Sequence, residues 1–271
     1  MIDQVTKALV SVRQKTPLVH HITNYVTVND CANICLAIGG SPIMADAVEE
    51  AKDIATISSS LVINMGTLNS RTVESMVAAG QKANEVGIPV IFDPVGAGAS
   101  AFRNETALML LAKIKFSVIR GNLSEIRFLT ENHSKTKGVD VAREDIDSDA
   151  TAIVVQCAKK LGCVVACTGK IDVISDGEKI VMVKNGNEML SDITGTGCMC
   201  TSLVGAFCGA NEDMLTSAVA GVISMGIAGE IAHDKMGDRG LGSFRVSLID
   251  AISQMDEGCM RGRARIDEKE N

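Results

Sequence analysis

The sequence predicts an α/β fold with a mostly parallel central sheet and helices on both faces. Between about residues 18 and 168, short β-branched runs alternate with longer segments of helical period, which is typical of parallel strands joined by helices. The last third, from Cys198 onward, has helical period, with turn signals between its apolar stretches. The chain has 271 residues, of which 46% are hydrophobic. We therefore expect a single domain over residues 1–271 with a large core.

The first third of the chain contains the elements of a βαβ unit. Residues 1–15 have the spacing of an amphipathic helix. Farther on, residues 62–66 are predicted as a strand, residues 70–86 as an amphipathic helix, and residues 88–93 as a second strand that ends on a carboxylate. A strand, a helix and a second strand in this order predict one parallel crossover of the sheet.

The middle of the chain continues the alternation and then changes. Residues 116–120 are predicted as a strand and residues 123–130 as a helix, and a helix that ends near Leu161 precedes a strand over residues 163–168. Two short pieces joined by the turn Asp176-Gly177 follow, and we expect them to form an antiparallel hairpin at the sheet edge. These pieces are residues 172–175 and 179–183.

Charge and composition exclude several kinds of partner. The formal net charge is −7, which argues against a nucleic-acid groove, because such a groove needs clustered Lys and Arg. Gly, Ser and a Glu interrupt the apolar segment 214–232, so we expect a buried helix there, not a membrane span. No basic stretch at the N-terminus leads into an apolar run with a cleavage site. We expect a cytoplasmic protein that acts on a small molecule.

Two polar segments are predicted to lie outside the core. Residues 133–149 are polar and charged, which is typical of a mobile loop. Near the end of the chain, Arg261, Arg263 and Arg265 alternate with small residues and precede the acidic stretch 267–270. We expect this last segment to be a solvated tail.

The nine cysteines favour buried free thiols over a disulfide framework or a zinc site. Their number is odd, and the pairs Cys31 with Cys35 and Cys163 with Cys167 lack the spacing of common zinc knuckles. Only four His are present to complete a ligand set. An intracellular protein is expected to keep such thiols reduced.

Polar residues stand at the predicted carboxyl ends of successive strands. In an open parallel sheet, ligands bind beyond these ends, where loops from neighbouring units converge. The residues at these ends supply a carboxylate, a guanidinium and several backbone donors, which together suit a nucleotide. They are Asn64, Gly66, Asp93, Arg120, Gly121-Asn122 and Thr168-Gly169.

A glycine-rich loop, Asp192-Ile193-Thr194-Gly195-Thr196-Gly197-Cys198, precedes the predicted helix 199–210. A loop of this kind presents free N–H groups and the positive end of the helix dipole, as an anion hole for phosphate requires. It matches neither the GxGxxG fingerprint nor the Walker motif. On spacing alone, an ordinary glycine turn before a buried helix is an equally good interpretation.

The loop is similar to the Asp-Thr-x-Gly-Ala-Gly-Asp signature of ribokinase-like enzymes, with Cys198 in the place of their catalytic Asp. Hydroxyethylthiazole kinases carry a Cys there, and three further segments resemble theirs in the same order. The chain therefore resembles the hydroxyethylthiazole kinase family from about residue 20 to 210, and a ribokinase-like three-layer sandwich is expected. The three segments are Asn24-Tyr25-Val26-Thr27-Val28-Asn29, Asp93-Pro94-Val95-Gly96-Ala97-Gly98-Ala99 and Gly121-Asn122-Leu123-Ser124-Glu125-Ile126.

The resemblance implies an ATP-dependent kinase with Mg²⁺. Phosphoryl transfer needs charge neutralisation, and Mg²⁺ typically binds through one or two carboxylates plus phosphate oxygens. Asp93 and Glu125 are the carboxylates expected to hold it, although Glu125 would also suit a helix capping box. Arg120, Thr168, Gly195 and Gly197 are expected to bind ATP. For Arg120 the alternative is a surface salt bridge, and for Thr168 a turn cap.

Cys198 is expected to act at the acceptor hydroxyl, because its place at a helix start should favour the thiolate. The resemblance implies an acceptor pocket for 4-methyl-5-(2-hydroxyethyl)thiazole, although Met44 in it could equally be a core residue. It also implies a homotrimer with acceptor sites at subunit boundaries. The pocket residues are Asn24, Val26, Met44, Gly66 and Gly195.

Other functions remain open at this point. A nucleotide-dependent hydrate dehydratase shares the fold, but the Cys in the glycine loop and the Asn-Tyr-Val-Thr segment favour the thiazole kinase. Pyrimidine and pyridoxal kinases are close alternatives, since pocket specificity is hard to read from sequence. A non-catalytic thiol sensor is the alternative from another class, and it has no need of Asp93, Glu125 and the glycine loop together.

Overall fold

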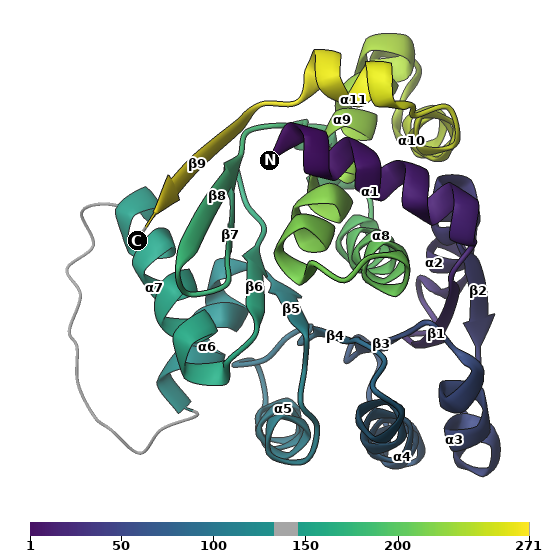
Figure 1. Cartoon of the computed structure of the whole chain (residues 1–271), viewed down its shortest axis with the longest axis vertical. Helices are drawn as coiled ribbons and strands as arrows, with labels where there is room; N and C mark the ends of the chain where they lie inside the picture. The colour runs from purple at the N-terminus through teal and green to yellow at the C-terminus, as the bar shows by residue number, and fades with distance from the viewer. Residues whose placement is uncertain (133–145, 271) are drawn as a thin grey trace.

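The computed structural model describes residues 1–132 and 146–270. In that part of the chain, a nine-stranded sheet forms the middle of three layers, in the order β2-β1-β3-β4-β5-β6-β7-β8-β9 (Figure 1). Strands β1 to β6 are parallel, and β7, β8 and β9 are added as antiparallel neighbours. The strands are β1 Leu18–Ile22, β2 Ser41–Met44, β3 Ser60–Asn64, β4 Val90–Asp93, β5 Val118–Gly121, β6 Val164–Cys167, β7 Asp172–Ser175, β8 Lys179–Val183 and β9 Ile266–Glu270.

Helices cover both faces of the sheet, as the sequence predicted (Figure 1). One face carries α3 Val48–Ile57, α4 Ser70–Val86, α5 Ala101–Lys113, α6 Leu123–Asn132 and α7 Ile146–Leu161. The other carries α2 Val28–Ile38, α8 Thr196–Ala210 and α9 Met214–Met236, with α1 Ile2–Lys15, α10 Leu241–Ser253 and α11 Glu257–Arg263 packed outside them. The short 3-10 helices η1 Glu188–Asp192 and η2 Gly237–Arg239 complete the described elements.

Several elements have the predicted bounds because local signals fix their ends. Helix α4 spans the predicted residues 70–86: Asn69 and Thr72 form a reciprocal capping box at its start, and Gly87 ends it in the left-handed conformation. The hairpin β7–β8 also forms as predicted around Asp176-Gly177. Strands β4, β5 and β6 begin later than predicted, and β5 includes Gly121, whereas β3 begins and ends two residues earlier than the predicted 62–66.

The core is aliphatic, and helices α8 and α9 lie within it. In the most apolar window of α9, 83% of the residues are buried inside the protein, so its hydrophobicity is that of a core helix. A Cβ on Gly221 of α9 would lie 2.7 Å from the backbone nitrogen of Val204 in α8. The two helices therefore pack more closely than any larger side chain would permit.

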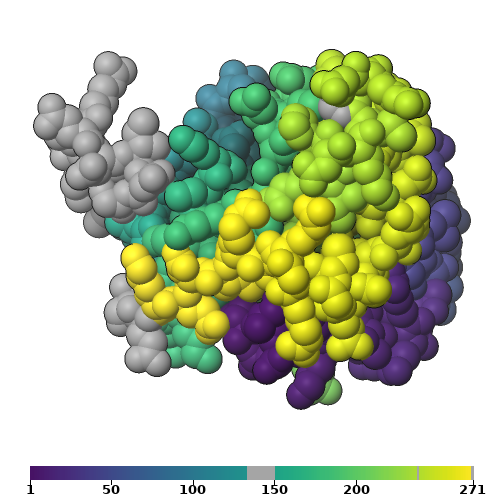
Figure 2. Space-filling view, turned by 90° about the horizontal axis from the view of Figure 1, so that it is seen from above, coloured from purple at the N-terminus to yellow at the C-terminus, as the bar shows by residue number. Residues whose placement is uncertain are grey.

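The predicted solvated tail is wrong. Residues Ile266–Glu270 form β9, which pairs with β8 from Val183 to Lys179. Arg261 forms an ion pair with Asp3 at the start of α1, and the C-terminal segment covers part of the N-terminal helix (Figure 2). A short charged stretch has little strand signal of its own, whereas the free edge of β8 offers a row of backbone partners.

Two further expectations concern polar and cysteine residues. Of the predicted loop 133–149, residues 133–145 lie outside the described residues, and Ile146 already begins α7. All nine cysteines are free, and seven are buried.

Candidate active site

The polar ends of the parallel strands meet at one edge of the sheet. Asn64 ends β3, Asp93 ends β4 and Gly121 ends β5, and Asn64 and Asp93 are partners in the sheet register. A cleft of about 400 Å³ opens there. It is lined by Asn24, Val26, Thr27, Gly66, Thr67, Asp93, Val95, Arg120, Asn122, Glu125, Thr194, Gly195, Gly197 and Cys198.

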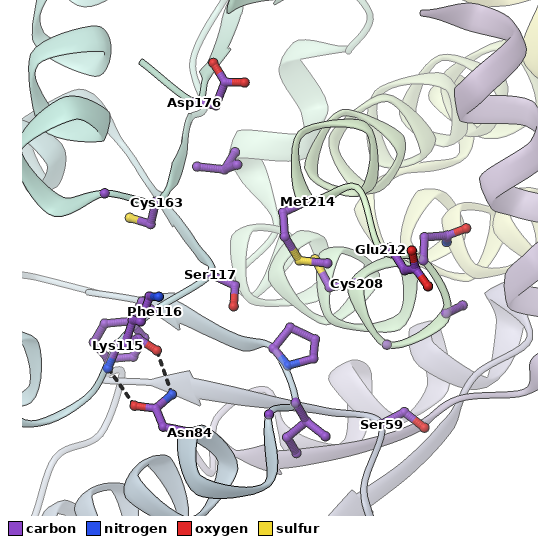
Figure 3. Close-up of a pocket in the computed structure, with 18 of the residues that line it drawn as sticks. Ser59, Asn84, Lys115, Phe116, Ser117, Cys163, Asp176, Cys208, Glu212 and Met214 are labelled. Carbon is purple, nitrogen blue, oxygen red and sulfur yellow. Dashed lines mark hydrogen bonds between the residues drawn. The ribbon is translucent and has the colours of Figure 1, made fainter. Parts of the chain in front are cut away.

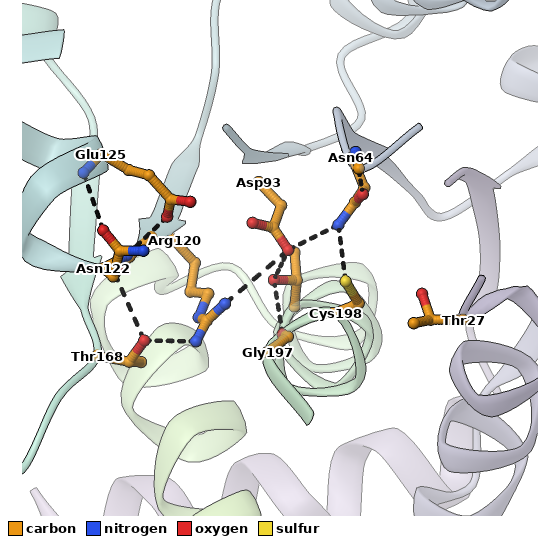
Figure 4. Close-up of polar contacts among 12 residues, drawn as sticks. Thr27, Asn64, Asp93, Arg120, Asn122, Glu125, Thr168, Gly197 and Cys198 are labelled. Atoms are coloured by element: carbon orange, nitrogen blue, oxygen red, sulfur yellow. Dashed lines mark hydrogen bonds and ion pairs between the residues drawn. The ribbon is translucent and has the colours of Figure 1, made fainter. Parts of the chain in front are cut away.

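The cleft brings together nearly all of the residues singled out from the sequence. Thr168 does not line the cleft, but it accepts a hydrogen bond from Arg120, and Arg120 lines the cleft (Figure 4). Met44 lies apart from the cleft lining: it ends β2, is half-buried, and is in register with His21 of β1.

Asp93 is a buried carboxylate in which one oxygen accepts hydrogen bonds and the other accepts none. Its Oδ2 accepts hydrogen bonds of 2.8 Å from Asn64 Nδ2 and from Thr201 Oγ1. Its Oδ1 is buried and has no hydrogen-bond partner among the described residues. Burial raises the pKa of Asp93 to about 6, although the nearby Arg120 acts in the opposite direction. A buried carboxylate oxygen without a partner indicates a place for a cation or a donor from a ligand.

Arg120 lies between Thr168 and Asp93, next to Gly197 at the start of α8 (Figure 4). Its Nη1 is 4.0 Å from Asp93 Oδ2, and its Nη2 donates to Thr168. Its Nε is buried without a partner in the described structure. Only 14% of the side chain is exposed, so the alternative of a surface salt bridge is not realised. The guanidinium retains donor capacity for phosphate oxygens.

Glu125 forms a capping box, which was the alternative role considered for it from the sequence. Its Oε2 accepts from Asn122 N at 2.8 Å, and Asn122 Oδ1 accepts from Glu125 N at 2.9 Å. Its Oε1 accepts from Gly96 N at 2.9 Å. The side chain is buried, and Glu125 and Asp93 both line the cleft. Each Glu125 oxygen retains a second lone pair, so capping and metal binding are compatible.

The glycine-rich loop ends in a helix start with free donors. Gly195 has φ 92°, and a Cβ there would lie 2.6 Å from Thr27 Cγ2. The first helical hydrogen bond runs from Met199 N to Gly195 O at 2.8 Å. The N–H groups of Thr196, Gly197 and Cys198 precede it and point along the helix axis, as in an anion hole.

Cys198 is half-buried, and its sulfur accepts hydrogen bonds from two amides. Asn24 Nδ2 and Asn64 Nδ2 both lie 3.3 Å from Sγ. Burial, followed by the negative charge of Asp93, raises the pKa of the Cys198 thiol. This direction is opposite to the one expected from the helix start, because burial and Asp93 disfavour the thiolate more than the donors Asn24 and Asn64 favour it.

Two loops form the part of the cleft that contains the acceptor residues predicted from the sequence. Asn24 Oδ1 accepts from Thr27, and Gly66 N donates to Asn64 Oδ1 at 2.8 Å. A Cβ on Gly66 would lie 2.6 Å from Asn24 Nδ2, so glycine is required for this approach. Next to them, Tyr25 and Val26 are 78% and 55% exposed.

Three residues have structural roles that were not predicted from the sequence. Arg103 of α5 donates to the carbonyls of Met65, Gly66 and Val95. Asp172 accepts from Gly169 N at 2.9 Å. Thr201 bonds to Asp93. A spacing of four between Gly197 and Thr201 on one helix face could have indicated Thr201, but a carbonyl-binding Arg inside a helix leaves no sequence signal.

A larger cleft, of about 810 Å³, lies at the opposite edge of the sheet (Figure 3). Two of its polar side chains are used within the protein: Lys15 Nζ donates to Ala210 O at 2.7 Å, and the Asn84 side chain pairs with the backbone of Lys115. None of the candidate site residues lines this cleft.

Comparison with known proteins gives a consistent result. The sequence profile of the hydroxyethylthiazole kinase family matches residues 9–258. The chain is 61% identical to a hydroxyethylthiazole kinase of Ruminiclostridium cellulolyticum over 98% of its length and 97% of that protein. It is 58% identical to one of Clostridium beijerinckii over the same shares of the two chains.

Solved structures agree in fold. A hydroxyethylthiazole kinase of Pyrococcus horikoshii OT3 superposes with a TM-score of 0.90 at 38% identity, covering 98% of both chains. A ribokinase-like superfamily protein of Enterococcus faecalis has a TM-score of 0.60 at 12% identity, over 94% of this chain and 83% of its own, which shows likeness of fold alone.

Proposed function

Because this chain belongs to the hydroxyethylthiazole kinase family, we propose that it transfers the γ-phosphoryl group of ATP to the hydroxyl of 4-methyl-5-(2-hydroxyethyl)thiazole. The product is the thiazole phosphate used for thiamine diphosphate biosynthesis by salvage. The observation that carries the proposal is the buried Asp93, whose free Oδ1 faces a cleft that also contains Arg120 and the start of α8. We propose that residues 1–271 act as one domain.

Arg120, Thr168 and the helix start at Gly195 and Gly197 bind the phosphates of ATP. The support is the free N–H groups before Met199 and the unpartnered Nε of Arg120. Asp93 and Glu125 hold Mg²⁺, which neutralises the phosphate charge when bound. Among the residues 1–132 and 146–270, no group of three or more His, Cys, Asp and Glu could hold a metal. A site of two carboxylates completed by phosphate oxygens and water suits Mg²⁺ better than metals that need a full protein ligand set.

The acceptor lies against Asn24, Val26, Gly66 and Gly195, with Met44 as a more distant pocket residue, and its hydroxyl faces Cys198. The hydroxyl oxygen bonds to the γ-phosphorus as the bond from that phosphorus to the β-phosphate oxygen breaks, and ADP leaves. Because the transition state is loose, the hydroxyl proton is lost late and ends in solvent. The Cys198 thiol therefore serves mainly to position the hydroxyl.

Self-association and location follow the family resemblance. We infer a homotrimer with the acceptor site at a subunit boundary, and the support is that Tyr25 and Val26 are exposed apolar side chains beside the cleft. A cytoplasmic location suits a salvage kinase that uses ATP. Light scattering of the purified protein tests the trimer, and a monomeric mass at micromolar concentration would contradict it.

A coupled ADP-release assay with Mg-ATP tests the function. The thiazole alcohol, hydroxymethylpyrimidine and pyridoxal are offered separately, beside a reaction without acceptor. Turnover with the thiazole alone is expected. A preference for pyrimidine or pyridoxal would remove the acceptor assignment and leave the phosphate site in place, and no ATP binding at all would remove the kinase assignment.

A further inference from the structure

Asn64, the last residue of β3, is only 2% exposed and touches four other groups of the cleft through one amide. Its Nδ2 donates to Asp93 Oδ2 at 2.8 Å and to Cys198 Sγ at 3.3 Å (Figure 4). Its Oδ1 accepts from Asn24 Nδ2 at 2.9 Å and from Gly66 N at 2.8 Å. A primary amide has two N–H donors and two acceptor lone pairs, so every one of them is in use.

The orientation of this amide is fixed by its neighbours. Turning it over would place Oδ1 against the Asp93 carboxylate and the Cys198 sulfur, and Nδ2 against two N–H donors. The contacts with Asp93, Asn24 and Gly66 would become repulsive or lose their hydrogen bond, and each unmet buried group carries a desolvation penalty. Asn64 therefore holds its neighbours at set distances.

Among the hydrogen bonds within the cleft, those of Asn64 are the direct link between Cys198 and Asp93. Asn24 also donates to Cys198 but does not bond to Asp93, and Thr201 donates to Asp93 but does not bond to Cys198. Asp93 belongs to the phosphate and metal side, and Cys198 to the acceptor side. The two halves of the reaction thus meet through one side chain.

We propose that Asn64 is a positioning residue, which acts through Cys198 to keep the acceptor hydroxyl in line with the phosphoryl group held on the Asp93 side. Because it rests on the proposed function, wild-type turnover of the thiazole is measured first. Misplacing a reacting group by about 1 Å can cost about 10²-fold in rate. Asn64→Ala is therefore expected to lower kcat about 10²-fold and to change the KM for ATP less than about threefold.

A double-mutant cycle separates positioning from a merely structural role. Asn64→Ala is combined with Cys198→Ala, where the group to be positioned is missing. If Asn64 acts through Cys198, Asn64→Ala should lower kcat by less than about threefold in the Cys198→Ala background. An equal fold-loss in both backgrounds overturns the proposal.

Thr201→Val is the matched control for this cycle. Thr201 donates to the same Asp93 oxygen at the same 2.8 Å, but it makes no hydrogen bond to Cys198. Thr201→Val should lower kcat by the same factor in the wild-type and the Cys198→Ala backgrounds. If its loss shrinks as much as that of Asn64→Ala, the coupling is not specific to Asn64 and the proposal fails.

Folding failure and low activity do not leave the question open. If Asn64→Ala is not folded, Asn64→Ser enters the same cycle. If Cys198→Ala turns over too slowly, the cycle is run on the dissociation constant of the thiazole by calorimetry, where the same coupling is expected and additivity counts against the proposal. An inactive wild type would reject the proposed function and this role together, whereas additive losses in an active enzyme would reject only this role.

Discussion

Gly197 and Arg120 approach so closely that a Cβ on Gly197 would lie 2.6 Å from Nη1 of Arg120. Gly197 does not have a positive φ, so its backbone would accept alanine and only the contact forbids it. Gly197→Ala must displace the guanidinium from Asp93 and Thr168. We expect kcat/KM for ATP to fall at least about tenfold in steady-state assays. Gly262→Ala is the control, since nothing lies within 4 Å of that position and activity should be unchanged.

Glu125→Gln separates metal binding from capping. Glutamine can still serve the capping box but has one acceptor oxygen, so Asn122 N or Gly96 N loses its partner. If Glu125 is only structural, this loss should lower the free energy of unfolding by about 1 kcal/mol and leave the Mg²⁺ requirement unchanged. If Glu125 binds Mg²⁺, the Mg²⁺ concentration for half-maximal rate should rise about tenfold or more. Titrating Mg²⁺ at fixed ATP, with thermal denaturation alongside, distinguishes the two. A destabilised variant with wild-type Mg²⁺ dependence would leave Glu125 as a cap only.

Substitution of Cys198 tests how much the thiol contributes. Serine retains a polar group at this position, so Cys198→Ser should keep turnover within about tenfold of the wild type. A carboxylate can accept from Asn24 and Asn64 and can also take up the hydroxyl proton, so Cys198→Asp should be at least as active. Steady-state kinetics with the thiazole measure both. Abolished turnover in both variants would show that the sulfur is indispensable.

Arg103 links the loop after β3 to the loop after β4, beside the part of the cleft proposed for the acceptor. Its guanidinium donates to the carbonyls of Met65, Gly66 and Val95, and methionine has a similar stem but no donor. Arg103→Met should raise the KM for the thiazole more than about tenfold, with a smaller change for ATP, because the acceptor loop loses its support. Arg71→Met serves as the control, since Arg71 is exposed and, in the part of the chain that the structure describes, its side chain pairs only with Asp46. Equal rises for both substrates would point to a general loss of fold.

Asp172 makes stability depend on pH. Burial raises the pKa of Asp172 to about 7, so the folded protein keeps a proton that the unfolded chain loses near pH 4. The contribution of Asp172 to the free energy of unfolding is complete below about pH 4. It is lost as pH rises toward 7, at up to about 1.4 kcal/mol per pH unit. Asp172→Asn keeps the acceptor for Gly169 and should lack this dependence. Urea unfolding gives the free energy of unfolding of both proteins at pH 5 and pH 7.5. An equal change between the two pH values in both proteins would exclude Asp172 as the source.

The layered fold and most of the candidate site could be predicted from the sequence. Helical and alternating periods identify helices and strands locally, and capping residues such as Asn69 and Gly87 fix their ends. The rule that ligands bind at the carboxyl ends of parallel strands then brings Asp93 and Arg120 to one cleft, because that geometry follows from the sheet alone.

Other features could not be predicted because they depend on partners far away in the chain. β9 forms because β8 presents a free edge, although its own residues have little strand character. Arg103 finds its three carbonyls in loops that only the folded chain assembles.

The sequence by itself determined the α/β architecture, the family resemblance and the residues gathered at the carboxyl edge of the sheet, since periodicity and motif order are local properties. The tertiary structure decided the state and linkage of those residues. Burial raises the pKa of the Cys198 thiol, although its place at a helix start alone favours the thiolate. Asn64 lies 134 positions from Cys198 in the sequence, and only folding brings its amide within hydrogen-bonding distance of both the sulfur and Asp93.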